Sequence, residues 1–296
     1  MKLTSFCLLL ATGLTPLASS YPTKHGSGSG SGPYPATYFT EPTLQNHTLY
    51  LPTRPPDDRP LPVLIWGNGG CRATGTRFAN FLTNIASYGY LVIASGPPNG
   101  TGLTTSQFMR DAILWVSAKA DQEHEYCGKG KWKYANIDTN AIAVAGQSCG
   151  GLETYQMRDD ERVKVLGIFN SGLIAEGSVP DLPDDGNVLE DPGVIAEVKK
   201  PVFYFIGGWG DVAYPNAKRD YHALEGVPKW TGNFPVGHSG TYTEDDGGAF
   251  GVAAVKWLEW VLRGDERAGG FFIDGGAEEA GWEETEGEGL EVFGSV

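Results

Sequence analysis

Basic residues are scarce in this sequence, and their shortage excludes one large class of function. Lys and Arg total 22 against 36 Asp and Glu, which gives a formal net charge of −14. Nucleic-acid binding depends on Lys and Arg side chains that neutralise phosphates. The densest basic stretch is only the "GKGKWK" of residues 128–133, so we expect no nucleic-acid partner.

Long hydrophobic runs are also lacking. After the N-terminal segment, no stretch reaches the roughly 18 apolar residues that a membrane-spanning helix needs, so no membrane anchor is expected. The N-terminal segment "MKLTSFCLLLATGLTPLASS" has a positive Lys2, a short apolar run and small residues before Tyr21. This pattern is typical of a signal peptide over residues 1–20, and it predicts a secreted, extracellular protein.

Cysteine is rare as well, with four in the whole chain. Cys7 would leave with the signal peptide, and the odd number that remains (Cys71, Cys127 and Cys149) predicts one disulfide and one free thiol. Export also makes Asn46 and Asn99 candidate glycosylation sites, because each begins an Asn-x-Thr sequon.

The two ends of the chain differ from its middle in composition. Residues 21–33 include a Gly/Ser repeat and are expected to be a flexible lead. Residues 274–296 are expected to be an acidic, solvated tail, because 274–291 hold eight acidic residues and no basic one. The intervening residues, 34–273, suit a single α/β domain.

Within 34–273, continuous apolar runs alternate with segments of helical periodicity. Runs of this kind predict buried strands of a mostly parallel sheet that has helices on both faces. The expected strands are 61–67, 90–96, 141–145, 163–172 and 201–208, and the expected helices are 76–89, 104–121 and 248–265.

The stretch "AIAVAGQSCGGLE" of residues 141–153 contains a Gly-x-Ser-x-Gly motif around Ser148. In a chain with 42 glycines the motif is weak evidence by itself. Its position between a buried strand and a helix is the one that a nucleophile elbow requires, and its glycines allow the sharp turn. Ser148 is therefore the candidate nucleophile.

A serine nucleophile needs a base and an acid that orients the base, in the chain order Ser, Asp/Glu, His. Asp211 follows the last predicted strand, and His238 lies in "FPVGHSGTY" before the closing helix. Asp245 and Asp246 are alternative acids, because they lie near His238 in the sequence. His222 is a less favoured base, since it falls within a helical pattern.

An oxyanion hole needs two backbone N–H donors. One is expected from Cys149, the residue after the nucleophile. The other is expected from Asn68 or Gly69 in the loop "WGNGGC", and the spacing does not decide between them.

The combination of "LIWGNGGC", "GYLVIASG", "GQSCGG", "GGWGDVAY" and "GHSGTY" resembles the α/β-hydrolase superfamily, over roughly residues 60–273. The chain looks most like secreted members related to the dienelactone-hydrolase and polyester-hydrolase branches. It departs from them in having Gly67-Asn68 where the oxyanion loop usually has His-Gly, and in having serine where true dienelactone hydrolases have cysteine. The resemblance implies a Ser148-His238-Asp211 triad, an acyl-enzyme and no cofactor.

These observations predict a secreted carboxylic-ester hydrolase that needs no metal. The stretch 173–197 is short for a large lid, and an open site would admit small or polymeric esters, with Trp66, Trp209 and Tyr242 as possible lining residues. A serine peptidase of the same fold, or a non-catalytic binding protein on a hydrolase scaffold, are the alternatives.

The favoured disulfide joins Cys71 to Cys149, because both are expected at the same end of neighbouring strands, beside the oxyanion donors. Cys127 would then be the free thiol. Pairing of Cys127 with Cys71 or with Cys149, or three free thiols, remain alternatives, since connectivity does not follow from sequence.

Overall fold

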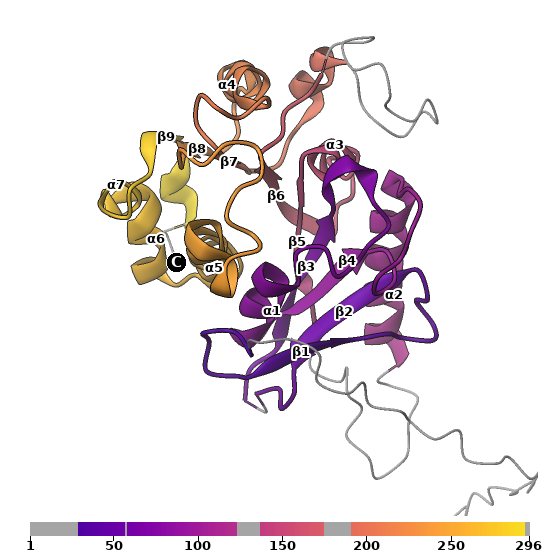
Figure 1. The fold of residues 1–296 in the computed structure, drawn as a ribbon. Coiled ribbons are helices and arrows are strands. Elements are labelled where there is room, and N and C mark those ends of the chain that lie inside the picture. Colours follow the sequence, from indigo (N-terminus) through magenta and orange to yellow (C-terminus); the bar gives the residue numbers. More distant parts are fainter. Residues whose placement is uncertain (1–28, 57, 123–136, 175–190, 294–296) are drawn as a thin grey trace, which may run out of the picture.

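The computed structural model describes residues 29–56, 58–122, 137–174 and 191–293. Through this part of the chain runs a nine-stranded sheet in the order β1-β2-β4-β3-β5-β6-β7-β8-β9 (Figure 1). In this order, the six strands from β4 to β8 are parallel to one another, and β1, β2 and β9 add antiparallel edges. The predicted α/β class with a mostly parallel sheet is confirmed. The strands are β1 Ala36–Phe39, β2 His47–Pro52, β3 Leu61–Gly67, β4 Leu91–Ser95, β5 Ile137–Gln147, β6 Val163–Phe169, β7 Val202–Ile206, β8 Lys229–Asn233 and β9 Glu283–Glu288.

Helices cover both faces of the sheet. One face carries α1 (Ala79–Ser87), α5 (Gly248–Arg263), α6 (Glu266–Ile273) and α7 (Gly276–Glu279), and the other carries α2 (Ser106–Gln122), α3 (Cys149–Tyr155) and α4 (Tyr214–Ala223). Four short 3₁₀ turns complete the described elements: η1 Gly69–Cys71, η2 Pro192–Glu197, η3 Asp245–Gly247 and η4 Leu290–Phe293.

Alternation along each central strand explains the two cores. In β3, Leu64 and Trp66 pack on the α1/α5 face, while Val63 and Ile65 pack on the α2/α3 face. Successive side chains of a strand point to opposite faces. A strand that is covered on both sides is therefore apolar at every position, and this is why these strands were visible in the sequence as continuous apolar runs.

The structure contains four strands that the sequence patterns did not indicate: β1, β2, β8 and β9. The strand β8 reads "KWTGN" and β9 reads "EETEGE". Both are short and mostly polar, so neither stands out from a loop by hydrophobicity. They are strands because each pairs with a neighbour that is already in the sheet.

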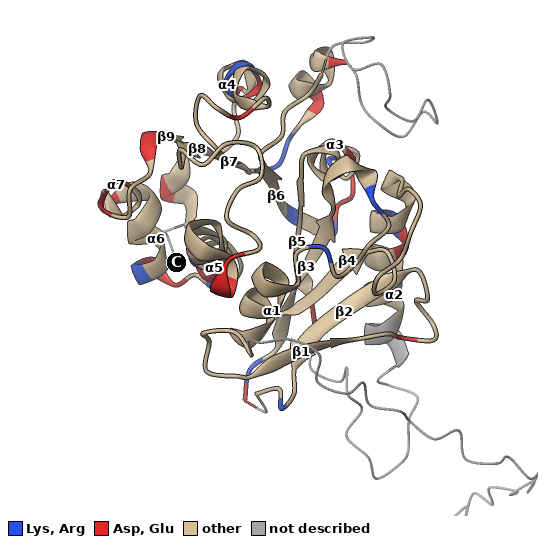
Figure 2. Ribbon diagram, viewed as in Figure 1, with Lys and Arg blue, Asp and Glu red and all other residues tan. Residues whose placement is uncertain are grey.

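The prediction of a solvated acidic tail was wrong for residues 274–293. This segment forms α7, β9 and η4, and β9 pairs with β8. Acidic residues of α7 and β9 lie at the edge of the sheet that β9 forms (Figure 2), and Lys229 and Lys218 form ion pairs with Glu288 and Glu286. This segment folds onto the domain because Trp282 is 2% exposed and packs among core aromatic rings.

The predicted flexible lead also needs a correction at its end. Ser31 and Gly32 donate hydrogen bonds to Asn84 and Ser87 of α1, so this part packs on the domain. The predicted signal peptide, residues 1–20, lies outside the described residues. In the part of the chain that the structure describes, no helix is both long and apolar enough to span a bilayer.

Candidate active site

Ser148 lies at the turn between β5 and α3, in a conformation that is rare for a residue with a side chain. Its φ is 54° and its ψ is −120°. The turn is held by the Ser148 N–H, which donates to the Phe169 carbonyl at 3.0 Å, and by the Ser171 hydroxyl, which donates to the Ser148 carbonyl at 2.7 Å. Non-glycine residues with positive φ cost free energy and persist where surrounding contacts impose them, often at functional sites.

The glycines around Ser148 are required by close approach of the backbone. A Cβ at Gly146 would overlap the backbone of Gly150, and a Cβ at Gly150 would overlap that of Gly67. A Cβ at Gly151 would overlap the Ser171 side chain. Strand β5, helix α3 and the end of β3 can therefore pack this closely only with glycine at these positions.

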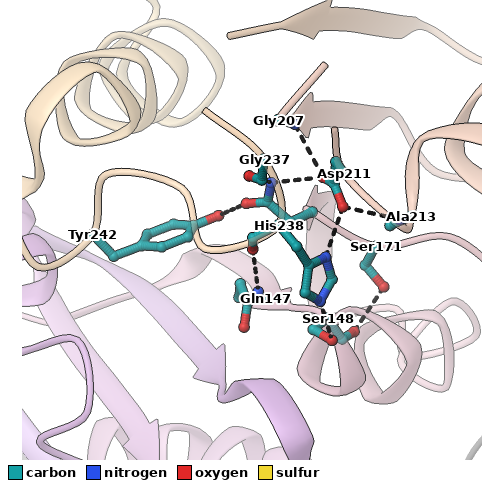
Figure 3. A network of polar contacts seen from close by, with 10 residues as sticks. Gln147, Ser148, Ser171, Gly207, Asp211, Ala213, Gly237, His238 and Tyr242 are labelled. Carbon is teal, nitrogen blue, oxygen red and sulfur yellow. Dashed lines mark hydrogen bonds and ion pairs between the residues drawn. The ribbon is translucent and has the colours of Figure 1, made fainter. Parts of the chain in front are cut away.

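The structure brings Ser148, Asp211 and His238 together at the carboxyl edge of the sheet (Figure 3). The His238 Nε2 lies 2.9 Å from the Ser148 Oγ, and its Nδ1 lies 2.6 Å from the Asp211 Oδ1. Asp211 follows β7, and His238 lies in the loop after β8. Ser148 and His238 are 90 positions apart in the sequence, yet with Asp211 they form one continuous line of hydrogen bonds.

Asp211 is almost fully buried, at 2% exposure, and it is saturated with hydrogen bonds. Its Oδ1 accepts from His238 and from the Ala213 N–H, and its Oδ2 accepts from the Gly207 N–H and the Asn170 amide. Burial by itself would raise the pKa of the Asp211 carboxyl, but the hydrogen bonds led by His238 outweigh burial and the pKa is lowered. Asp211 is therefore a carboxylate, which is the form that orients an imidazole.

The alternative acids and bases do not take part in this line. Asp245 and Asp246 lie in η3, and the acid hydrogen-bonded to His238 is Asp211. His222 lies in α4, where its ring contacts Tyr221.

The loop after β3 lies against the turn at Ser148. The buried Asn68 side chain donates to the carbonyls of Arg72, Thr74 and Ser95, so it holds the loop rather than facing outward. Both candidate donors lie beside this turn, because a Cβ on Gly69 would be 3.5 Å from the Ser148 Cβ and a Cβ on Gly150 would be 2.8 Å from the Asn68 N. Cys149 is the first residue of α3, and the first N–H groups of a helix have no intrahelical acceptor.

A disulfide joins Cys71 to Cys149, with a Cα–Cα distance of 5.2 Å. The predicted pairing is confirmed, and the pairings of Cys127 with either partner are excluded. Both half-cystines are buried. The bond links the loop after β3 directly to the residue after Ser148. Cys127 itself lies outside the described residues.

Two of the three expected lining aromatics are elsewhere. Trp66 and Tyr242 are fully buried in the core on the α1/α5 face, where their rings contact each other and Phe81. Trp209 is 79% exposed on the loop that carries Asp211, and one side of its ring packs on Tyr214. A small cavity opens beside Trp209, lined by the glycine-rich turn 207–210, Pro235 and Glu284 among others.

Sequence reasoning missed three residues that support the triad. Gln147 donates through Nε2 to the His238 carbonyl at 3.0 Å, and Asn170 and Ser171 contact Asp211 and Ser148. Asn170 and Ser171 follow β6 directly, so a polar pair at a strand end beside the predicted site was the available signal.

The sites predicted from the sequons are accessible. Asn46 and Asn99 are both exposed, in turns before β2 and after β4. Among the described residues, no group of three His, Cys, Asp or Glu is arranged to hold a metal ion. The chain matches no family model, and a search of curated proteins finds no relative.

Proposed function

We propose that this protein is a secreted serine hydrolase of the α/β-hydrolase fold that cleaves carboxylic esters. The observation that carries the proposal is the hydrogen-bonded line Ser148–His238–Asp211. It stands at the carboxyl edge of a mostly parallel sheet, and ligands of open α/β folds bind at this edge. The strained turn at Ser148 adds support, because it has the geometry that a nucleophile elbow requires.

Each group has a role that its contacts support. The His238 Nε2 takes the proton of the Ser148 hydroxyl as the oxygen attacks the ester carbonyl, and it then gives that proton to the leaving alcohol. Asp211 fixes the ring through Nδ1 and stabilises the imidazolium. We expect the backbone amide of Cys149, together with that of Gly69 or Asn68, to donate to the oxyanion. Water, activated by the same histidine, then hydrolyses the acyl-enzyme.

Export is part of the proposal. The N-terminal pattern predicts a signal peptide, and a buried disulfide is typical of proteins that fold in an oxidising compartment. Expression in a eukaryotic secretory host should yield a mature chain that begins at Tyr21 and carries glycans on Asn46 and Asn99. Retention of residues 1–20 in the secreted chain would contradict the signal-peptide assignment.

Labelling with a fluorophosphonate probe tests the catalytic proposal directly. The purified protein should be labelled on Ser148 and should hydrolyse acyl esters. Ser148→Ala should lose the label and reduce hydrolysis by several orders of magnitude, because the hydroxyl forms the covalent intermediate. Ser117→Ala, on α2 and remote from the site, is the matched control and should keep both the labelling and the hydrolysis rate.

The same panel separates the alternative functions. A non-catalytic binding protein would take no label. A serine peptidase would be labelled but would cleave peptide amides in preference to esters. The ester proposal fails if Ser148→Ala keeps more than a few per cent of the rate.

A further inference from the structure

Asn170 follows the strand that lies between the two strands leading to the proposed nucleophile and acid. It follows β6, whose neighbours in the sheet are β5 and β7. Its side chain is fully buried and its φ is 42°. Asparagine tolerates this left-handed conformation better than most other residues with a side chain.

The Asn170 amide contacts both loops that supply the rest of the triad. Its Nδ2 donates to the Asp211 Oδ2 at 2.7 Å and to the Gly237 carbonyl at 3.3 Å. Gly237 immediately precedes His238 in the chain. One amide group therefore holds the acid and the backbone that carries the base.

Tyr242 fixes which way this amide points. The Tyr242 hydroxyl donates to the Asn170 Oδ1. Burial, together with the nearby Asp211 charge, raises the pKa of Tyr242 well above its ordinary value, so the hydroxyl keeps its proton and remains a donor. With Oδ1 occupied by this donor, Nδ2 must face Asp211.

The next residue completes the connection to the nucleophile. The Ser171 hydroxyl donates to the Ser148 carbonyl at 2.7 Å. Asn170 and Ser171, at the end of β6, thus together contact Asp211, the backbone before His238 and the backbone of Ser148.

We infer that Asn170 is a positioning residue, which, held by Tyr242, keeps Asp211 and the His238 loop in register with Ser148. The inference rests on the proposed hydrolase function. Asp211 keeps a fixed orientation because each of its oxygens has two donors, and Asn170 supplies one of them. Small misplacements of catalytic groups can cost about 10²-fold in rate, so loss of this donor should lower kcat and leave ester binding intact.

Asn170→Asp tests the inference with a side chain of the same shape. It replaces the donor to Asp211 with a second carboxylate, and two adjacent carboxylates share a proton or repel each other. The added negative charge also favours the protonated His238 ring. We expect kcat at neutral pH to fall about 10- to 100-fold with KM within about 2-fold, and the acid limb of the pH–rate profile to move to higher pH.

Two ionisable groups of the described residues are linked to the His238 ring through hydrogen bonds. Among the described residues, Asp211 is the ionisable side chain that hydrogen-bonds to His238, and Tyr242 faces the same carboxylate through Asn170. A shift in the pH profile of Asn170→Asp therefore reports the charge placed beside Asp211.

Tyr242→Phe is the second variant, and it retains the aromatic packing if Asn170→Asp fails to fold. It removes only the hydroxyl that orients the amide, so kcat should fall about 3- to 10-fold at unchanged KM. Two matched controls alter buried groups far from the triad. Asn84→Asp changes a buried asparagine of α1, and Tyr90→Phe removes a buried hydroxyl that bonds Glu259. Both controls should keep kcat and the pH profile.

The outcomes separate the two proposals. If the wild-type protein takes no fluorophosphonate label, the proposed function fails. If the wild type is labelled and hydrolyses esters, but Asn170→Asp or Tyr242→Phe matches it in kcat and pH profile, the positioning role is overturned. A loss of thermal stability with unchanged kcat would likewise leave Asn170 with a structural role alone.

Discussion

At the scale of single residues, the proposed triad depends on two buried polar side chains, Asp211 and Asn170, whose nitrogen and oxygen atoms all form hydrogen bonds. Asp211 is enclosed by protein yet keeps a lowered pKa, because four donors compensate for the loss of water. Asp220 shows the opposite balance. Burial is the largest influence on it and raises its pKa, although Arg219, Tyr155 and the Leu173 N–H donate to it. The pKa values of these two buried aspartates thus shift in opposite directions, because their hydrogen-bond donors compensate for burial to different extents.

Asp211→Asn should reduce kcat by about 10⁴-fold while leaving the fold intact, because an amide favours the wrong tautomer of the His238 ring. Steady-state kinetics on a simple ester would measure the loss. Asp245→Asn, at an exposed position of η3, is the control and should remain active. If Asp245→Asn were the inactive variant, the assignment of the acid would be wrong.

The lowered pKa of Asp211 also predicts how stability depends on pH. A carboxyl whose pKa is lower in the folded state than in the unfolded state stabilises the fold above its unfolded pKa. That contribution is lost as the pH falls through the folded pKa, below about 4. Urea unfolding of the wild type and Asp211→Asn should therefore converge in this acidic range.

At the scale of elements, the site is assembled from loops at one edge of the sheet. The adjacent strands β5 and β6 are followed directly by Ser148 and Asn170, the loop after β7 carries Asp211, and the loop after β8 carries His238. Parallel strands place their carboxyl ends at the same edge, so residues far apart in sequence become adjacent. The disulfide adds the loop after β3 to this group.

Replacing Cys71 with Ala should weaken both the fold and the proposed catalysis. The disulfide closes a segment of 78 residues, for which the chain-entropy model gives about 4.5 kcal/mol of stabilisation. The bond also ties the Gly69 loop to Cys149, so kcat should fall as the oxyanion donors loosen. Urea unfolding and ester kinetics measure the two effects.

Reductant provides the control for this variant. Dithiothreitol should bring the wild type close to Cys71→Ala, and it should change Cys71→Ala no further. A reduced wild type with full kcat would show that the disulfide stabilises the fold without positioning the donors.

At the scale of the whole molecule, the C-terminal segment completes the domain. β9 extends the sheet beyond β8, and Trp282 covers Trp230, Phe250 and Phe205 on the α1/α5 face. Acidic residues of this segment lie at the edge of the sheet that β9 forms (Figure 2). This edge strand is rich in charge, a property that discourages pairing with other chains.

A chain that stops at Ile273 should therefore fail to fold stably, although the sequence pattern placed the end of the domain there. Trp282→Ala is the milder change and should cost about 3–5 kcal/mol of unfolding free energy, as for other buried aromatic residues. Val252→Ala, at an exposed position of α5, should stay within about 0.5 kcal/mol of wild type. A truncated chain with wild-type thermal unfolding would show that the C-terminal segment adds no stability.

The amino-acid sequence by itself determined the features that depend on local order. The central strands were visible because both of their faces are buried, and the turn at Ser148 because its close approaches require glycine. The order Ser148, Asp211, His238 followed from one fold hypothesis. Predicting this order did not require knowing which atoms of the three residues form hydrogen bonds.

Only the tertiary structure decided the features that depend on long-range pairing. The choice of Cys149 as the partner of Cys71, the contact of Asn170 with Asp211, and the pairing of β9 with β8 each join segments far apart in the chain. Trp66 and Tyr242 could equally have faced a ligand or the core, because an aromatic side chain suits both environments. Contacts with each other and with Phe81 of α1 place them in the core, since burial depends on what packs against a residue and not on the residue alone.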